Sequence, residues 1–268
     1  MMKKLVAKTK KLNTVETLTD DLFKLGVQKG STLLVHSSLS SIGWVNGGPV
    51  AVIDALMNVV TKNGTLVMPS QTGDLSDPAN WGNPPVPEDW WEEIRQTMPP
   101  YHPEITPTRG MGQIAEAFRN YPEVSRSDHP AVSFAAWGKE KTHVLADHQI
   151  DFGLGEKSPL AKLYQLNAQI LFIGTGYETN TAFHLGEHRA PGNQIVLEGA
   201  PIIKNGQRTW YTYHDIEYQE EKFEQIGKQF EQQYKVNQEW IGKAKSRLFS
   251  LREAVDYSQK YFTKIRQE

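Results

Sequence analysis

The chain has 268 residues, of which 38% are hydrophobic, and a formal net charge of -2 at pH 7. This composition predicts a globular protein and excludes a disordered one, and the near-neutral charge, without basic runs interleaved with aromatic residues, argues against nucleic acid as a partner. The chain contains no cysteine, which excludes disulfides, thiolate metal sites and a cysteine nucleophile.

The N-terminal stretch, residues 1–14, is rich in lysine but is followed by no apolar segment of the kind that a signal peptide requires. No apolar run approaches the roughly 18 residues that a membrane-spanning helix needs. We therefore expect a soluble, cytoplasmic protein that has no membrane partner. The oligomeric state is left open by the sequence, with a homodimer as one arrangement.

The first predicted elements form a strand–helix–strand unit. Residues 15–26 have the apolar spacing of a helix that ends at a glycine, and residues 31–39 predict a buried strand that runs into a polar turn. A strongly apolar helix over residues 50–60 and a strand over residues 65–70 follow. Because strand–helix–strand units favour parallel pairing, we expect a parallel sheet.

Residues 71–108 differ from their surroundings, since they are rich in proline and tryptophan. A loop of this length is uncommon inside a compact domain unless it covers a site or binds something. We expect it to cover a substrate. The alternative is a surface excursion that is packed by its own tryptophans.

The second half of the chain alternates between predicted helices and strands. Helices are predicted over residues 111–121, 139–148 and 158–166, and strands over residues 131–138 and 168–176. Residues 194–203 and 207–215 predict a hairpin, residues 216–247 have helix-friendly spacing, and residues 250–268 predict an amphipathic helix. With no repeat and no linker, we expect a single compact α/β domain over residues 1–268, with a β-hairpin appendage and C-terminal helices.

Two segments combine glycines with a predicted helix start. Residues 35–49 carry hydroxyl side chains and glycines between a strand and a helix, and residues 107–116 place Arg109 and two glycines before a helix. Free backbone N–H groups at helix starts attract anions, and two such sites suggest a ligand with more than one phosphate. Neither segment is a P-loop or a dinucleotide fingerprint. A plain tight turn, and a surface ion pair for Arg109, are the alternatives.

The segment HLGEH places His184, Glu187 and His188 in the pattern H-x-x-E-H. On a helix this pattern could supply two zinc ligands around an acid/base carboxylate, but Gly186 interrupts the helix and a third ligand is not evident. The metal-free alternative makes His184 a general base close to the glycine-rich end of a strand, where ligands gather in open α/β sheets. We favour this alternative and expect no metal, with a zinc hydrolase as the rival.

Several segments in one order carry a resemblance to a known family. They are LLVHSSLSSIGWVNGG, GTLVMPSQT, TRGMGQIAEAFR, DHPAVSFAAWG, SPLAKLYQL and ILFIGTGYETNTAFHLGEH. In this order they resemble the aminoglycoside 3-N-acetyltransferase family, from about residue 15 to the C-terminal helices. The sequence is most similar to the Bacillus branch of that family.

The resemblance implies the family's own α/β fold and transfer of an acetyl group from acetyl-coenzyme A to the 3-amino group of a 2-deoxystreptamine antibiotic. It implies no metal. It also implies a coenzyme A site formed by His36, Ser37, Ser38, Ser40, Val45, Gly47, Gly48, Arg109, Met111 and Gly112. Asp74 and Asp77 stand where the family's acidic residues meet the cationic antibiotic.

The resemblance assigns the family's catalytic histidine to His184 and its carboxylate to Glu187. As general base, His184 would deprotonate the amine, while Glu187 or Asp215 orients the imidazole. Backbone N–H groups around residues 37–40 would stabilise the oxyanion. Since there is no cysteine, the attack would be direct. An acetyl-coenzyme A-dependent enzyme that acts on a different amine is the alternative.

Overall fold

The computed structural model describes residues 6, 7, 9 and 11–267 of the chain. Much of the lysine-rich N-terminal stretch, on which the expectation of no signal peptide rests, therefore lies outside the described residues, as does residue 268. Within the described residues, none of the helices combines the length and the apolarity that a membrane crossing requires.

A mixed β-sheet lies at the centre of the fold, with the strand order β3–β4–β2–β1–β5–β9–β8. The strands are β1 (Thr32–Ser37), β2 (Thr65–Pro69), β3 (Ser125–Arg126), β4 (Phe134–Gly138), β5 (Gln169–Ile173), β8 (Asn237–Ile241) and β9 (Ala244–Ser250). Strand β1 pairs in parallel with β2 and β5, whereas the pairs that involve β3, β4, β8 and β9 are antiparallel. The predicted parallel unit is confirmed for the three central strands, but the whole sheet is mixed.

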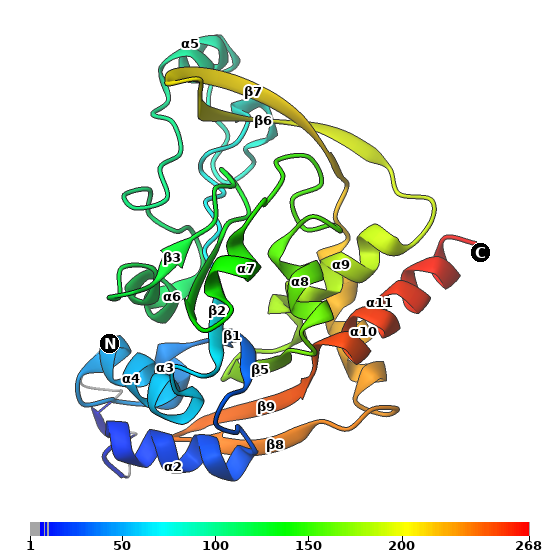
Figure 1. Cartoon of the computed structure of the whole chain (residues 1–268). Coiled ribbons are helices and arrows are strands. Elements are labelled where there is room, and N and C mark those ends of the chain that lie inside the picture. Colours follow the sequence, from blue (N-terminus) through cyan, green and yellow to red (C-terminus); the bar gives the residue numbers. More distant parts are fainter. Residues whose placement is uncertain (1–5, 8, 10, 268) are drawn as a thin grey trace.

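Helices cover both faces of the sheet, because successive residues of its buried strands point to opposite sides. Leu33 and Val35 pack into one hydrophobic core, and Leu34 packs into the other. The first core is closed by α2 (Val15–Leu25), α4 (Gly48–Val60) and α6 (Gly112–Arg119). The second is closed by α7 (Lys141–Leu145), α8 (Pro159–Gln165), α9 (Ala182–Arg189), α10 (Phe223–Phe230) and α11 (Leu251–Ile265) (Figure 1).

Local signals set the ends of several helices where the sequence predicted them. Thr14 caps α2 through its side chain, and Gly26 ends that helix in the left-handed region, with φ at 108°. The hydroxyl of Ser158 caps α8, and that of Ser250 caps α11. The predicted helices at both ends of the chain are thus confirmed, with boundaries fixed by capping side chains.

The predicted hairpin is confirmed as a separate ribbon of β6 (Ile195–Lys204) and β7 (Gln207–Ile216). In Figure 1 it lies away from the central sheet and beside α5 (Trp91–Thr97), which belongs to the proline-rich loop. Arg208 of the ribbon donates from Nε to the carbonyl of Met98 over 2.9 Å. The loop is therefore ordered against the ribbon rather than lying free.

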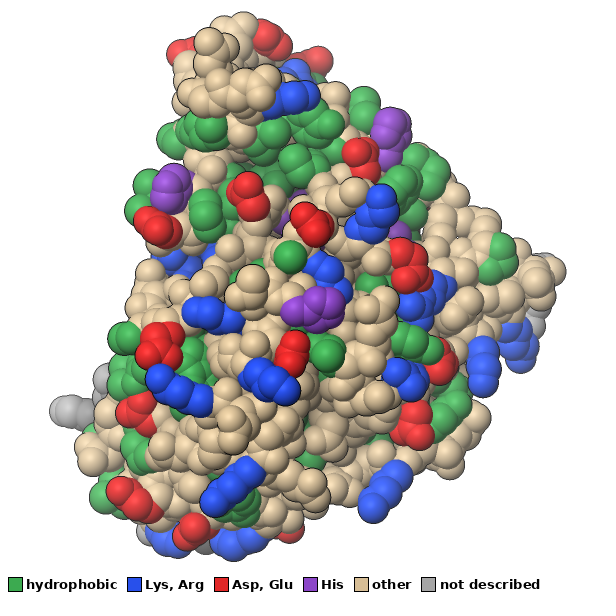
Figure 2. Space-filling model, viewed as in Figure 1, with side chains coloured by type: hydrophobic (Ala, Val, Ile, Leu, Met, Phe, Trp, Pro, Cys, Tyr) green, Lys and Arg blue, Asp and Glu red, His purple; other side chains and the backbone are tan. Residues whose placement is uncertain are grey.

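The proline-rich loop also contains the short helical turns η1 (Pro78–Asn80) and η2 (Glu88–Trp90). Figure 2 shows acidic and basic side chains interspersed over the face of the molecule in that view. This mixture agrees with a surface whose formal charges nearly cancel.

The helix expected over residues 216–247 is wrong for most of its length. Only the turn η4 (Glu220–Lys222) and α10 are helical there, and the remainder leads into the antiparallel pair β8–β9. The turn between these strands uses Gly242, whose φ is 58°. Strand β9 is held by pairing with β5, as in the register Ile170 to Phe249. The segment forms strands because β5, far away in the sequence, leaves an edge free to pair with it. The spacing of apolar residues within the segment gives no sign of that edge.

Candidate active site

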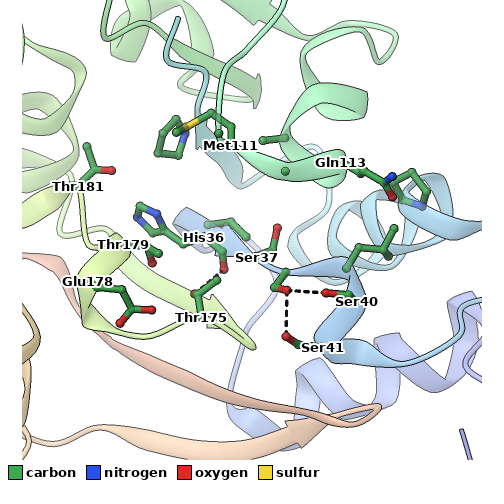
Figure 3. Close-up of a pocket in the computed structure, with 18 of the residues that line it drawn as sticks. His36, Ser37, Ser40, Ser41, Met111, Gln113, Thr175, Glu178, Thr179 and Thr181 are labelled. Carbon is green, nitrogen blue, oxygen red and sulfur yellow. Dashed lines mark hydrogen bonds between the residues drawn. The ribbon is translucent and has the colours of Figure 1, made fainter. Parts of the chain in front are cut away.

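A cavity of about 1250 Å³ opens at the carboxyl ends of the three central strands. His36 and Ser37 end β1, Pro69 ends β2, and Thr175 follows β5, and all four residues line the cavity. Figure 3 shows His36 and Ser37 between Met111 on one side and Thr175 on the other. Ligands of open α/β sheets bind at such strand ends, so this cavity is the candidate active site.

A serine cluster forms one wall of the cavity, where the chain leaves β1 and enters α3 (Leu39–Ile42). The Ser41 hydroxyl donates to Ser38 Oγ over 2.9 Å, and the hydroxyls of Ser38 and Ser40 lie 3.3 Å apart (Figure 3). The backbone N–H of Ser38 donates to the carbonyl of Ile173 over 2.9 Å. Among the N–H groups around residues 37–40 that the sequence offers as oxyanion donors, that of Ser38 is therefore occupied.

The helices α4 and α6 both begin at the cavity. Gly48 and Met111 line it at these two starts, and Gly47 caps α4 in the left-handed region with φ at 88°. The described first turn of each helix contains no acidic side chain. At α4 the N–H of Gly48 donates to the carbonyl of Val45 and the next residue, Pro49, has no N–H, so this start contributes mainly its helix dipole. The N–H groups at the start of α6 and the dipoles of both helices therefore favour an anionic ligand here.

The structure gathers most of the residues that the resemblance assigned to coenzyme A. The cavity wall includes His36, Ser37, Ser38, Ser40, Val45, Gly48, Met111 and Gly112. Gly47 and Arg109 are not among the described lining residues. Gly47 acts as a helix cap, and the exposed Arg109 forms an ion pair with Asp74 at 3.5 Å.

His36 stands out among the lining residues because it is buried without a polar partner. Its side chain packs edge-on against Phe172, and within the described structure its Nε2 atom has no hydrogen-bond partner. Burial lowers the pKa of His36 to about 3, so the imidazole is neutral at physiological pH. His36 Nε2 is therefore a neutral nitrogen that is both buried and unpaired.

His184 lies in the first turn of α9 with its side chain only 4% exposed. Its Nδ1 atom is 3.3 Å from Glu187 Oε2, and its Nε2 atom is 3.2 Å from Glu220 Oε1. Burial acts to lower the pKa of His184, but the hydrogen bonds that its ring donates to Glu187 and Glu220 outweigh burial and raise the pKa above its ordinary value. Both His184 and Glu220 line the cavity.

Glu187 is completely buried behind the imidazole of His184. Its Oε1 atom accepts the backbone N–H of Gln219 over 2.9 Å and lies 3.5 Å from Arg266 Nη2 on α11. A backbone donor and a guanidinium thus hold one carboxylate oxygen, while the other faces the histidine. This arrangement fixes the imidazole in one orientation, as in a catalytic dyad.

Asp215 is the other carboxylate that the sequence offered as the partner of His184. The structure places it on β7, where it accepts the Tyr218 hydroxyl over 2.8 Å and lies 3.5 Å from His188 Nε2. Burial, together with the positive charges of His184 and Arg266, lowers the pKa of His188 to about 3. Of the two carboxylates that the sequence offered, Glu187 is therefore the one beside His184, and His188 is a neutral buried side chain.

The carboxylates predicted to meet the substrate have partners of their own. Asp77 caps η1 and binds Arg95 at 2.7 Å, and Asp74 pairs with Arg109. Among the described residues, the carboxylates that line the cavity are Glu178 and Glu220. Sequence reasoning missed both, because each lies in a short irregular turn where no periodicity marks it.

The H-x-x-E-H pattern does not bring two histidines to one point. His184 Nε2 faces Glu220, whereas His188 Nε2 faces Tyr218 and Asp215. Among the described residues there is no group of three or more His, Cys, Asp or Glu side chains that could hold a metal ion. The two histidines therefore occupy different environments.

Comparison with known proteins gives consistent matches over nearly the whole chain. Residues 34–263 match the sequence profile of a family described as aminoglycoside 3-N-acetyltransferase. The chain is 55% identical over 262 residues to the SPbeta prophage-derived aminoglycoside N(3')-acetyltransferase-like protein YokD of Bacillus subtilis (strain 168), covering 97% of this chain and 96% of YokD. It is 34% identical over 258 residues to aminoglycoside N(3)-acetyltransferase VII of Streptomyces paromomycinus, covering 90% and 88% of the two chains.

Solved structures match the fold as well. The crystal structure of YokD from Bacillus subtilis superposes with a TM-score of 0.98 at 53% identity, covering 99% of each chain. A structure of AAC-IIIb as a binary complex with CoASH superposes with a TM-score of 0.84 at 29% identity, covering 95% of this chain and 98% of that one. The arrangement of helices and strands is therefore shared with these proteins.

Proposed function

The chain belongs to the aminoglycoside 3-N-acetyltransferase family, and from this premise we propose that it moves an acetyl group from acetyl-coenzyme A to the 3-amino group of a 2-deoxystreptamine aminoglycoside. The observation that carries the proposal is the buried pair of His184 and Glu187. The imidazole of this pair lines the same cavity as the starts of α4 and α6. A proton acceptor and an anion site thus share one cavity.

The reaction converts an ammonium group and a thioester into an amide, a thiol and one free proton. His184 Nε2 takes a proton from the acceptor nitrogen, whose lone pair then forms the N–C bond to the acetyl carbon. The C–S bond breaks, and the sulfur leaves as the thiol of coenzyme A after taking up a proton. Glu187 stabilises the imidazolium in the interval. With no cysteine in the chain, the acetyl group passes directly to nitrogen.

Coenzyme A would lie along the wall formed by the serine cluster and the two helix starts. The complex of AAC-IIIb with CoASH supports a coenzyme A site in this fold. The pyrophosphate would face the N–H groups at the start of α6 and the positive dipole end of α4. Because the N–H of Ser38 is occupied, we assign contact with the thioester oxygen to another donor on the wall, the Ser37 hydroxyl.

Substitution Gln113→Glu tests this placement of the phosphates. Gln113 is exposed in the first turn of α6 and lines the cavity, so the change puts a carboxylate where an anion should bind, while a helix start tolerates the acid. We expect the dissociation constant for coenzyme A, measured by calorimetry, to rise at least tenfold, with an unchanged melting temperature. The control Gln28→Glu adds the same charge before the start of β1, at the opposite end of that strand. If Gln113→Glu and Gln28→Glu bind coenzyme A with equal affinity, the phosphates do not lie at the start of α6.

The activity itself is tested by the release of free thiol from acetyl-coenzyme A when kanamycin is added to the wild-type protein. We expect thiol release that depends on the aminoglycoside and that saturates with it. A protein that releases thiol only with other amines is an acetyltransferase with a different acceptor. A protein that releases no thiol with any amine contradicts the proposal.

A further inference from the structure

The face of His184 that must accept the substrate proton is already occupied. Glu220 begins η4, shortly after the end of the ribbon strand β7, and its Oε1 atom lies 3.2 Å from His184 Nε2. The side chain of Glu220 is 66% exposed, whereas that of His184 is 4% exposed. An exposed carboxylate thus reaches in from the rim of the cavity to the buried nitrogen.

The two carboxylates beside His184 are held very differently. Glu187 is buried and is fixed by Gln219 and Arg266. Within the described structure, the carboxylate of Glu220 has His184 as its one ion-pair partner, and a side chain this exposed can turn away into water at little cost. Glu187 is therefore a permanent partner of the imidazole, and Glu220 is a replaceable one.

Carboxylates at both ring nitrogens favour the protonated imidazole, which cannot act as a base. Tyr218 also lies against the ring of His184, 4.4 Å away between ring centroids, and itself contacts His188 and Asp215. Arg266 lies on the other side, 3.5 Å from Glu187 Oε1. Of these titratable groups around the ring, Glu220 is the one on the side that faces the cavity. The pKa of Glu220 is lowered, chiefly by its hydrogen bond to His184, so the carboxylate is charged at neutral pH.

We propose that Glu220 is the residue that receives the ammonium group of the acceptor, and that the ammonium group draws Glu220 away from His184 Nε2 as it binds. The proposal rests on the proposed function and adds a specificity-determining residue to it. An ammonium group has three N–H donors, so it can bind the carboxylate and still direct one N–H to the imidazole. The same event frees the base and positions the nitrogen that it must deprotonate.

This displaceable contact between Glu220 and His184 would also favour cationic acceptors over neutral ones. A neutral hydroxyl compound offers no charge to compete with the imidazolium for Glu220, so it would leave the base blocked. A cationic amine offers a charge-assisted hydrogen bond of comparable strength. The contact between Glu220 and His184 therefore selects the acceptor by charge at the reacting atom itself.

The test compares Glu220→Gln with the control Glu221→Gln, which removes the same charge from the neighbouring exposed residue of η4. In the free protein, NMR titration of the imidazole should show a lower pKa for His184 in Glu220→Gln than in the wild type, and no change in the control. Calorimetry with kanamycin, in the absence of acetyl-coenzyme A, should show a dissociation constant roughly tenfold higher in Glu220→Gln than in the wild type, and no change in Glu221→Gln.

An unchanged titration of His184 would overturn the contact, and an unchanged affinity for kanamycin would overturn the role in binding the acceptor. Both measurements are made without the acetyl donor, so they are independent of turnover. A wild-type protein that shows both expected effects but releases no thiol from acetyl-coenzyme A would overturn the proposed function and leave the role of Glu220 standing. For an active protein, the acid limb of kcat/KM should move to lower pH in Glu220→Gln.

Discussion

Replacement of His184 by alanine is expected to lower turnover by about two to four orders of magnitude, the range that follows the loss of a general base. The imidazole lines the cavity through a nitrogen whose opposite side is fixed by the buried Glu187. Without it, the ammonium group of the acceptor stays protonated and cannot attack the thioester. Steady-state release of thiol from acetyl-coenzyme A measures the effect, with coenzyme A affinity as the check that the cavity is intact.

Two further variants in the same helix separate a base from a pair of metal ligands. Glu187→Gln should cost less turnover than His184→Ala, because the side chain keeps its shape and loses its charge. His188→Ala should cost less again, since His188 is a neutral residue that contacts Tyr218 and Asp215. Equal loss of activity in both histidine variants, together with stoichiometric zinc in the purified protein, would contradict this assignment.

Substitution Gly186→Ala is expected to lower the free energy of unfolding by about 3 kcal/mol, at the upper end of what overpacking costs. A Cβ atom on Gly186 would lie 2.0 Å from Ser258 Oγ and 2.5 Å from the carbonyl oxygen of Val255. The serine can rotate, but the carbonyl belongs to the backbone of α11. The two helices would have to separate, and a fall in melting temperature of roughly 6–12 °C should follow.

The matched control is Gly82→Ala, because a Cβ atom at Gly82 would meet nothing within 4 Å. This variant should melt within about a degree or two of the wild type, since an open surface site imposes no clash. Gly186 lies between His184 and Glu187, and Arg266 of α11 reaches Glu187. The folded fraction of Gly186→Ala should therefore also lose turnover. A melting temperature of Gly186→Ala equal to that of the wild type would contradict the close packing of α9 against α11.

The elements that the sequence predicted well are those whose signals are local. The strands β1 and β2 are short apolar runs next to strongly periodic helices, and α11 begins at the capping Ser250. The hairpin β6–β7 turns at Asn205 and Gly206, both with positive φ, as the sequence there suggests. Nothing distant is needed to specify these segments.

The elements that escaped prediction depend on partners far away in the chain. Residues 237–250 pair as β8 and β9 because β5 leaves an edge open, and their charged and aromatic composition suits a helix equally well. Gly186 argues against a helix when it is considered alone. In the structure it is the point where α9 comes close to α11, so the residue that weakened the prediction is required by the packing.

The candidate site was partly accessible from the sequence, mainly through the family resemblance. His184 and Glu187 are one helical turn apart, so their contact follows from spacing alone. The sequence could not decide whether Glu187 or Asp215 orients His184, because the place of Asp215 depends on how the ribbon returns to α9. Glu220 could not be found, because it reaches His184 from a turn that lies 36 residues further along by residue number.

The most direct test of the central claim is the position of the acetyl group on the product. Kanamycin incubated with acetyl-coenzyme A and wild-type protein should gain a single acetyl group by mass spectrometry, and NMR should locate it as an amide on the 3-amino group of the 2-deoxystreptamine ring. His184→Ala should yield the same product at a rate lower by the factor given above. Acetylation at any other nitrogen, or on oxygen, or no product from the wild-type protein would contradict the account.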